Sequence, residues 1–349
     1  MKEISNQTID LVVTSPPYPM IKMWDDVFSQ INPLIKELLE KQEGMNAFEL
    51  MHKELDKIWK EIVRVTKPGS FVCINIGDAT RTIGGEFQLF PSHARIIDFF
   101  TKNNFVLLPS IIWRKPTNSP NKFMGSGMLP AGAYVTLEHE YILIFRKKGK
   151  RTFTKEEKIR RRESAYFWEE RNQWFSDVWE FPGINQQLNN LHLRERSAAY
   201  PFDLAYRLIN MYSIKGDWVL DPFLGTGTTT LAAIVSGRNS YGYEIDVNFE
   251  SIIKKRIKNA KAFGNELISQ RLHQHIDFIK QRISNKSNVK YTSKIYSFPV
   301  VTSQETDICL NFINEIKMTD KNVYQVDYNE TTFFNETIVV SKKTLKDFI

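Results

Sequence analysis

Apolar residues in the first part of the chain recur with two different spacings. The run Ile9–Val13 is almost entirely apolar, which is typical of a short buried strand. Across Ala47–Val65 the apolar residues recur at helical spacing, and Lys67–Gly69, which reads Lys-Pro-Gly, predicts the end of that helix. Ser70–Ile76 is again apolar and predicts a second buried strand. The alternation favours an α/β fold with helices on both faces of a sheet.

The alternation continues along the chain. We expect strands at Val106–Arg114 and Glu138–Phe145, separated by Lys115–Tyr134, a long loop rich in Pro, Gly, Asn and Ser. Such loops in compact domains tend to be functional. The remaining predicted elements are helix Phe90–Phe100, helix Phe202–Tyr212, strand Trp218–Leu220, helix Thr228–Ser236, strand Ser240–Glu244 and helix Phe249–Arg282.

Composition narrows the class of protein. The 349 residues are 42% hydrophobic and 25% charged, as expected of a soluble globular protein, and no run reaches the roughly 20 apolar residues of a membrane span. The first residues lack the apolar core of a signal peptide, so the expected compartment is the cytoplasm. The two cysteines, Cys73 and Cys309, support neither a disulfide framework nor a cysteine zinc site. No His, Cys and carboxylate spacing predicts a metal site.

Positive charge is concentrated in one strip. The chain carries 47 Lys and Arg against 40 Asp and Glu, a net charge of +7. Arg146–Arg162 alone holds ten Lys or Arg and two Glu, so this strip accounts for +8 and the remainder is close to neutral. A localised basic strip is what phosphate binding needs. The residues that we expect to contact the phosphates of a polyanionic partner are Lys147, Lys148, Lys150, Arg151, Arg160, Arg161 and Arg162.

A glycine-rich turn joins a predicted strand to a predicted helix. The turn reads Asp-Pro-Phe-Leu-Gly-Thr-Gly-Thr-Thr over Asp221–Thr229. Its glycines let the backbone pass close to a ligand, and the helix start offers free N–H groups. It lacks the Lys of a phosphate-binding Walker loop. Glu244 ends the next strand about 20 residues on, where an acidic side chain typically binds ribose hydroxyls. A nucleoside-containing cofactor is indicated; an ordinary tight connection is the alternative.

A second motif, Thr14-Ser15-Pro16-Pro17-Tyr18, follows the first predicted strand. Two prolines remove two backbone donors, which leaves carbonyl oxygens and Ser15 Oγ as acceptors. An exocyclic amino group is a poor nucleophile because its lone pair is delocalised into the ring, and acceptors for its hydrogens free that lone pair. Tyr18 offers a flat face on which an extruded base stacks. Alone, the motif is equally compatible with a rigid turn.

Together the two motifs resemble the amino-methyltransferases of bacterial restriction-modification systems, specifically the permuted β group, in which the catalytic motif precedes the AdoMet loop. Further matches are the Lys-Pro-Gly helix end, Glu138–Phe145 and Asp177–Trp179, and the resemblance covers roughly residues 8 to 260. It implies a doubly wound, Rossmann-like AdoMet-dependent methyltransferase fold with a permuted motif order and an inserted recognition region. The residues implied to form the catalytic pocket are Ser15, Pro16, Pro17 and Tyr18. Those implied to bind S-adenosyl-L-methionine are Asp221, Pro222, Phe223, Gly225, Thr226, Gly227, Thr228 and Glu244.

The chain departs from this family pattern at two places. Where members often have His-Pro-Ala-x-x-Pro, this chain has Arg196-Ser197-Ala198-Ala199-Tyr200-Pro201, which leaves cofactor contacts there in doubt. Many members also have a further strand, with Gly-Asp, upstream of the catalytic motif, for which this chain offers no counterpart. The residue that closes over the cofactor adenine therefore stays unassigned.

The resemblance also bears on the base that is methylated. Ser-Pro-Pro-Tyr resembles the cytosine-N4 enzymes, whereas Asp- or Asn-Pro-Pro-Tyr is more usual for adenine N6; since Ser and Asp both accept an amino hydrogen, adenine N6 stays open. Cytosine C5 methylation needs a thiolate nucleophile, and Cys73 and Cys309 are interpreted as packing residues.

Two further expectations concern single side chains. Asp78 is only a weak candidate for accepting the amino proton. The three tryptophans expected to belong to the core are Trp168, Trp174 and Trp179.

The expected domains are a catalytic domain at 1–264, a target-recognition region at 115–200 inserted within it, and a C-terminal extension of unknown role at 265–349. The expected partner is double-stranded DNA, and no membrane is expected. Whether a cognate restriction endonuclease acts separately stays open, as do monomer and homodimer. Rival hypotheses are a nicotinamide dehydrogenase, which leaves Ser-Pro-Pro-Tyr unused, and a non-catalytic DNA-binding protein, which explains neither motif. RNA and protein methyltransferases usually carry the catalytic motif after the cofactor loop.

Overall fold

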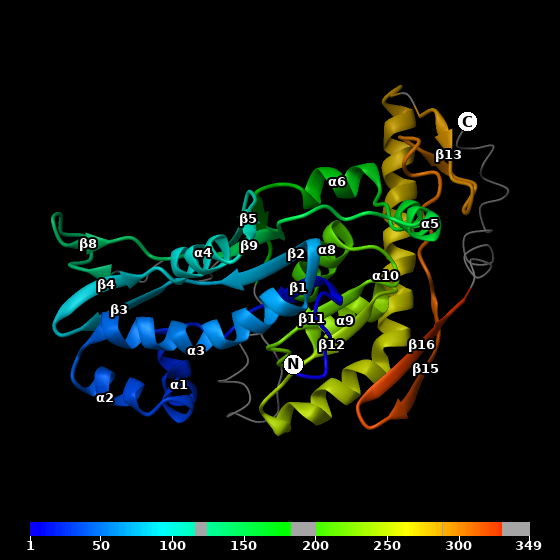
Figure 1. Ribbon diagram of the computed structural model, residues 1–349. Coiled ribbons are helices and arrows are strands. Elements are labelled where there is room, and N and C mark those ends of the chain that lie inside the picture. Colours follow the sequence, from blue (N-terminus) through cyan, green and yellow to red (C-terminus); the bar gives the residue numbers. More distant parts are fainter. Residues whose placement is uncertain (116–123, 183–199, 288, 330–349) are drawn as a thin grey trace. The chain divides into compact units, whose positions relative to one another are not determined.

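The computed structural model describes residues 1–115, 124–182, 200–287 and 289–329 (Figure 1). The chain forms two compact units. Unit 1 consists of residues 1–7, 14–148 and 176–201, and unit 2 consists of residues 8–13, 149–175 and 202–349. Each unit is therefore assembled from segments that lie far apart in the sequence.

The sheet of unit 1 is mixed. Its strands follow the order β10 (Val178–Glu180), β6 (Ile111–Arg114), β9 (His139–Lys147) and β2 (Thr66–Ile76), and β5 (Phe105–Leu107) also pairs with β9. The β10–β6 pair is parallel, and all three strands that pair with β9 run antiparallel to it. The single strand predicted at Val106–Arg114 is divided into β5 and β6. Pro109, which has no backbone N–H to donate, lies between them.

Helices α3 (Gly44–Val65) and α4 (Ser92–Lys102) provide the apolar side chains of this unit's core. The ring of Phe100 on α4 lies 4.7 Å from that of Phe145 on β9 and 5.8 Å from that of Trp59 on α3. All three side chains are fully buried. Helical spacing in α3 and strand alternation in β9 therefore converge on one core, as the apolar pattern predicts.

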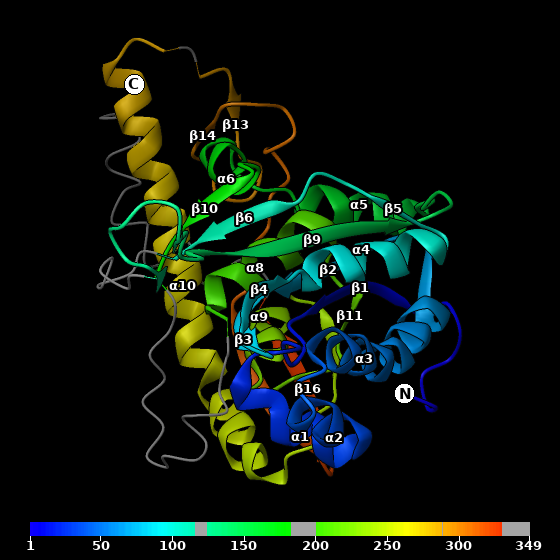
Figure 2. The same cartoon turned by 90° about the vertical axis from the view of Figure 1, so that its left-hand side faces the viewer.

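Smaller elements complete unit 1. Helices α1 (Asp25–Ile31) and α2 (Leu34–Glu40) follow the turn η1 (Lys22–Trp24) and pack against α3 (Figure 2). The remaining strands form two antiparallel hairpins, β3 (Ala79–Ile83) with β4 (Glu86–Phe90) and β7 (Met124–Gly125) with β8 (Ala133–Tyr134).

Unit 2 contains a parallel sheet in the order β1 (Ile9–Thr14), β11 (Trp218–Asp221) and β12 (Asn239–Gly242). Helix α9 (Thr228–Val235) crosses from β11 to β12, and α8 (Phe202–Tyr212) precedes β11. Strand β1 is buried at all six positions, which explains its almost entirely apolar sequence. The strands and helices predicted here are confirmed, except that β12 ends two residues before Glu244.

A long helix, α10 (Glu250–Ser284), follows the short turn η2 (Val247–Phe249) and connects the parallel sheet to the C-terminal part of unit 2. The predicted domain boundary at residue 264 falls inside this helix. A Cβ on Gly264 would lie 2.9 Å from Val235 and 3.0 Å from Ile313, so α10 packs closely against both α9 and β15. Asn265 also exchanges hydrogen bonds of 2.7 and 3.0 Å with the backbone of Ile313.

The rest of unit 2 surrounds α10. It comprises α5 (Lys155–Glu163), α6 (Trp168–Trp174), the ladder β13 (Tyr291–Thr292) with β14 (Pro299–Val300), and the hairpin β15 (Ile313–Asp320) with β16 (Val323–Tyr328) (Figure 1). Within the described ranges, no helix combines the length and apolar character that crossing a membrane requires.

Candidate functional site

The Ser15–Tyr18 motif is part of a hydrogen-bonded network in unit 1. The hydroxyl of Tyr18 donates to Glu140 Oε2 at 2.8 Å and accepts from Asn75 Nδ2 at the same distance. Ser15 Oγ lies 3.1 Å from the Tyr18 hydroxyl. Asn75 Nδ2 also donates to Glu140 Oε2 at 2.6 Å. The network therefore joins the motif to two side chains that its sequence does not contain.

Pairing of β2 with β9 explains why Asn75 and Glu140 meet. Asn75 pairs with Ile142 in the antiparallel ladder, so Glu140, two residues before Ile142, points to the same face as Asn75. A Cβ on Gly77 would lie 3.0 Å from Tyr18 Cε2 and 3.4 Å from Glu140 Cγ. Glycine at this position thus lets the Tyr18 ring lie directly over the backbone beyond β2.

The carboxylate of Glu140 is also the partner of a cation. Its other oxygen forms an ion pair with the ammonium group of Lys115, and that group lies 4.5 Å from the centre of the Trp113 ring. The Glu140 side chain is 13% exposed. A carboxylate this buried is expected to be paired, and here a cation, an amide and a phenol share it.

The direction of each hydrogen bond can be assigned from the chemistry of the groups. Burial, and then the negative charge of Glu140, raise the pKa of Tyr18 well above its usual value, so the phenol keeps its proton. That proton goes to Glu140, which only accepts. The Ser15 hydroxyl must therefore donate to the Tyr18 oxygen. Its oxygen accepts only a long contact of 3.5 Å from Asn75 Nδ2 among the described residues, so a lone pair stays available as an acceptor.

Asn75 contributes a second acceptor. Its Nδ2 group is directed at Tyr18 and Glu140, whereas its Oδ1 atom is buried and has no hydrogen-bond partner among the described residues. A buried, unsatisfied amide oxygen costs free energy unless a ligand or water supplies a donor. The site thus presents two acceptor oxygens, Ser15 Oγ and Asn75 Oδ1.

Asp78, the weak candidate for a proton acceptor, has other partners. Its carboxylate accepts from the backbone N–H of His93 at 3.1 Å and lies 2.7 Å from His93 Nδ1. The His93 ring stacks on Tyr141 at 4.1 Å. Tyr141 neighbours Glu140 on β9, and successive strand side chains point to opposite faces. The Asp78 carboxylate therefore holds the first turn of α4 and is not part of the Ser15 network.

The predicted cofactor loop of unit 2 is organised by two carboxylates. Asp221 accepts from the backbone N–H of Phe223 at 3.0 Å and from Thr229 Oγ1 at 2.5 Å. Glu244 accepts from the backbone N–H of Gly225 at 2.7 Å and of Asp246 at 2.8 Å. The structure thus brings Glu244, from beyond β12, directly to the loop between β11 and α9.

Two glycines give this loop its shape. Gly225 has φ +54° and Gly227 has φ +84°, and side chains rarely adopt either conformation. A Cβ on Gly225 would meet no atom within 4 Å, so open space lies against the loop at that residue. Three other residues of the predicted motif are buried: Pro222, Thr226 and Thr228.

The sequence did not predict that two residues near Glu244 belong to this site. Ile245 is 86% exposed and Val247 is 79% exposed, so both present apolar surface to solvent directly after the carboxylate. An exposed apolar pair beside Glu244, the acid predicted to bind a ribose, would suit the flat face of a purine. The sequence shows that apolar residues follow Glu244, but it does not show that their side chains are exposed. Arg196 and Ser197 lie outside the described residues.

The basic strip divides into two groups. Lys147 Nζ donates to the backbone oxygens of Val63 at 2.6 Å and Thr66 at 2.7 Å, and burial lowers its pKa. Arg151 forms two hydrogen bonds of 2.7 Å with Asp217. These two cations stabilise the fold. The exposed cations of the predicted set are Lys148, Lys150, Arg160, Arg161 and Arg162.

The three tryptophans expected in the core do not all lie there. Trp179 is 1% exposed and Trp174 is 6% exposed, as predicted. Trp168, at the first position of α6, is 38% exposed, so that prediction is wrong for this residue. Its backbone N–H, however, is tied to Glu305 at 2.9 Å.

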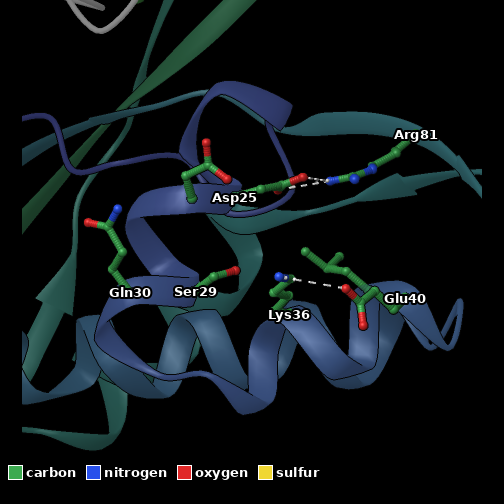
Figure 3. Close-up of a pocket in the computed structure, with 8 residues that line it drawn as sticks. Asp25, Ser29, Gln30, Lys36, Glu40 and Arg81 are labelled. Atoms are coloured by element: carbon green, nitrogen blue, oxygen red, sulfur yellow. Dashed lines mark hydrogen bonds and ion pairs between the residues drawn. The ribbon is translucent and has the colours of Figure 1, made fainter.

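Unit 1 also contains an open pocket of about 460 Å³ (Figure 3). It is lined by α1, α2 and β3, and it contains the ion pairs Arg81–Asp25 at 2.8 Å and Lys36–Glu40 at 3.9 Å. Burial raises the pKa of Asp25, while the charge of Arg81 opposes that shift. No residue of either predicted motif lines this pocket.

Comparison with known proteins identifies relatives over most of the chain. Residues 9–255 match a family described as DNA methylase, of the N6 and N4 type. The chain is 57% identical to the Type II methyltransferase M.MthZI of Methanothermobacter thermautotrophicus, over 95% of this chain and 92% of that protein. It is 51% identical to the Type II methyltransferase M.MjaI of Methanocaldococcus jannaschii, over 74% of this chain and 88% of that protein.

A solved structure supports the fold. TTHA0409 of Thermus thermophilus, crystallised with S-adenosyl-L-methionine and described as a DNA modification methylase, matches 74% of this chain and 89% of its own. The TM-score is 0.57 and the sequence identity is 31%. The predicted α/β, Rossmann-like methyltransferase fold is thereby confirmed.

Proposed function

Since the chain belongs to the DNA methylase family whose members methylate adenine N6 or cytosine N4, we propose that it methylates cytosine N4 in DNA. S-Adenosyl-L-methionine is the methyl donor in this proposal. The network in which Glu140, Tyr18 and Ser15 leave the Ser15 oxygen as an acceptor supports action on an exocyclic amino group. The choice of cytosine N4 over adenine N6 rests on Ser15 at the first position of Ser-Pro-Pro-Tyr.

The acceptors suit the chemistry of an exocyclic amino group. Its two hydrogens need two acceptors, and Ser15 Oγ and Asn75 Oδ1 supply them. When both hydrogens are held, the nitrogen lone pair is no longer drawn into the ring and can attack a methyl group. The methylated nitrogen then loses one of its hydrogens as a proton to solvent. Because Glu140 fixes both Tyr18 and Asn75, the acceptors are oriented before the base arrives. Pro16 and Pro17 keep the Ser15 backbone rigid.

The residues proposed to hold the methyl donor fit it chemically. S-Adenosyl-L-methionine, when bound, supplies an electrophilic methyl group on a cationic sulfur that leaves as a neutral thioether. The carboxylate of Asp221 offers charge complementarity to the amino-acid end, and Glu244 offers acceptors for the ribose hydroxyls. Open space at Gly225 and the exposed side chains of Ile245 and Val247 suit the nucleoside. The other residues in the proposed set are Pro222, Phe223, Thr226, Gly227 and Thr228.

We propose that exposed cations of the basic strip contact DNA phosphates. Four of them form no ion pair in the described part of the chain: Lys148, Lys150, Arg160 and Arg161. Arg162 pairs with Asp307 at 3.0 Å, but its side chain is 68% exposed. Lys147 and Arg151, whose charged groups already have partners, are left out of the proposal. Phosphate contacts give affinity without sequence information.

The relatives' names favour a restriction-modification role. M.MthZI and M.MjaI are both named as Type II methyltransferases, and the first aligns with nearly the whole chain. We therefore propose that this chain modifies a specific DNA site, in partnership with a separate endonuclease that cleaves the same site when it is unmethylated.

Mass spectrometry of nucleosides tests the proposal. Unmethylated bacterial DNA is incubated with the protein and isotope-labelled S-adenosyl-L-methionine, then digested to nucleosides. Labelled N4-methylcytosine is expected, and Ser15→Ala should reduce its yield while cofactor binding persists. Labelled N6-methyladenine would keep the mechanism and overturn the choice of base. No labelled base at all, with cofactor binding intact, would contradict action on DNA.

A further inference from the structure

Three side chains capable of binding a metal ion converge in unit 2. They are Glu169 on α6, His275 on α10 and Glu305 in the segment after β14, and one ligand atom from each lies within 4.8 Å of the others. We propose that Glu169, His275 and Glu305 bind a divalent transition-metal ion of the zinc type. This proposal is independent of the methyl-transfer site.

His275 has the hydrogen bonding of a metal ligand. Its Nε2 lies 3.1 Å from the backbone oxygen of Pro299, which only accepts, so Nε2 carries a hydrogen. In the neutral ring Nδ1 then holds the lone pair, and it faces Glu169 Oε1 at 2.8 Å. Ligating histidines usually donate their other N–H to a carbonyl or carboxylate in this manner.

The imidazole is also held rigidly. It is fully buried, stacks on Phe167 at 4.0 Å and lies 4.9 Å from the ring of Phe298. A ligand whose orientation is fixed before binding loses little freedom when the ion arrives. The same rings exclude water from one side of the cluster.

The charges of the cluster do not balance without a cation. Glu305 is 2% exposed, and the Oε2 atom of Glu169 is buried without a hydrogen-bond partner among the described residues. The two carboxylate oxygens lie within 4.8 Å of one another, and they repel each other unless a cation lies between them. Arg271 on the same helix is already paired with Glu170. A divalent cation with a neutral imidazole balances both carboxylates.

The ligand set points to a particular class of ion. One imidazole nitrogen and two carboxylate oxygens suit Zn²⁺, whereas Ca²⁺ and Mg²⁺ prefer all-oxygen sites with more ligands. Glu305 also accepts from the backbone N–H groups of Trp168 at 2.9 Å and Thr302 at 2.6 Å, and ligating carboxylates are themselves commonly hydrogen-bonded. The ion would clamp α6, α10 and the segment after β14.

The test uses the full chain without an affinity tag. Metal is removed with EDTA, ZnCl2 is added, excess metal is removed by gel filtration, and bound zinc is measured by elemental analysis beside thermal unfolding. We expect one zinc ion per chain and a rise of several degrees in Tm. Co²⁺ in place of zinc should give visible absorption.

Two variants and one matched control decide the outcome. Glu169→Gln keeps the shape of a half-buried side chain, and it should weaken zinc binding at least tenfold, as should His275→Gln. His273→Gln is the control, because His273 is exposed on the same helix and its Nδ1 lies 2.7 Å from the backbone oxygen of Ser269. If His275→Gln fails to fold, Glu169→Gln still gives the answer. Zinc absent from the unaltered chain, or bound equally by Glu169→Gln, would overturn the proposal in favour of a buried imidazolium–carboxylate pair.

Discussion

The hydroxyl of Tyr18 donates a hydrogen bond of 2.8 Å to Glu140, a residue 122 positions away. This contact fixes the donor direction in the proposed catalytic site. Because the phenol proton is used by Glu140, Ser15 donates to the Tyr18 oxygen and keeps a lone pair for another donor. We therefore propose Glu140 as a positioning residue that acts on the base through Tyr18 and Ser15.

Removing the Tyr18 hydroxyl should slow the methyl-transfer step. Tyr18→Phe keeps the ring but breaks the link to Glu140, so Ser15 loses its fixed orientation. A hydrogen bond to a charged group contributes roughly 1.5–3 kcal/mol, so kcat should fall about 10- to 100-fold. Single-turnover methylation measures this, with the KM for S-adenosyl-L-methionine expected to stay unchanged.

Glu140→Gln provides the companion measurement. Its amide keeps the size of the side chain, and Tyr18→Phe with Glu140→Gln together should cost little more than either change alone, because both break one relay. Fully additive losses would show that Glu140 and Tyr18 act separately. Unchanged kcat in both single variants would contradict the relay.

Glu244→Gln should weaken binding of S-adenosyl-L-methionine. Each oxygen of the carboxylate accepts from one backbone N–H, that of Gly225 or that of Asp246. In glutamine one of these oxygens becomes an NH2 group, which cannot accept, so one of the two hydrogen bonds is lost. We expect a loss of about 10- to 100-fold in affinity, measured by calorimetry. Glu250→Gln is a matched control, since Glu250 forms an exposed i,i+4 pair with Lys254. An equal effect of both changes would argue against a specific role for Glu244.

Neutralising Arg160 and Arg161 should weaken DNA binding in a salt-dependent way. Each lost phosphate contact lowers the slope of log K against log salt by roughly 0.9, so the double change to Gln should lower it by about 2. Arg151→Gln should instead lower the free energy of unfolding, because Asp217 would lose its bidentate partner. DNA binding that is insensitive to Arg160 and Arg161 would remove the basic strip from the proposal.

Acid should destabilise the fold partly through His52. This residue is fully buried on α3, and burial, with a smaller contribution from Arg95, lowers its pKa from 6.5 to about 3. Its stabilising contribution is complete above pH 6.5 and is lost as pH falls towards 3, because only the unfolded chain binds the proton. The loss is about 1.4 kcal/mol per pH unit in that window.

His52→Gln isolates this contribution. Urea unfolding at pH 4.5 and 7.5 should show that the unaltered chain loses about 2 to 3 kcal/mol more than the variant between the two values. Any loss of stability in the variant from altered packing is the same at both pH values, so it cancels in this comparison. Parallel losses in both proteins would contradict the assignment.

Local sequence patterns predicted much of the fold and the residues of the proposed cofactor site. Helical spacing predicted α3 and α8, and consecutive residues form the turn from Asp221 to α9, so their geometry depends on neighbours in the chain. The acid after β12 was found for the same reason. Pro109 was visible too, but its effect of dividing one predicted strand into two depends on how both halves pair with β9.

Local sequence patterns could not predict the interaction partners of side chains that lie far apart in the chain. Whether Lys147 and Arg151 face solvent depends on the backbone oxygens and carboxylates that folding brings near, and their sequence context resembles that of Arg160. The same applies to Glu169 and His275, whose separation of 106 positions matches no metal-binding motif.

The sequence by itself determined the fold class, the Ser15–Tyr18 motif and the cofactor loop, because each depends on residues close together in the chain. Only the tertiary structure decided that Glu140 orients Tyr18 and that Asn75 leaves an acceptor free. The reason is that hydrogen-bond partners are set by which strands become neighbours and in which register. Local spacing does not encode that choice; the packing of the whole chain does.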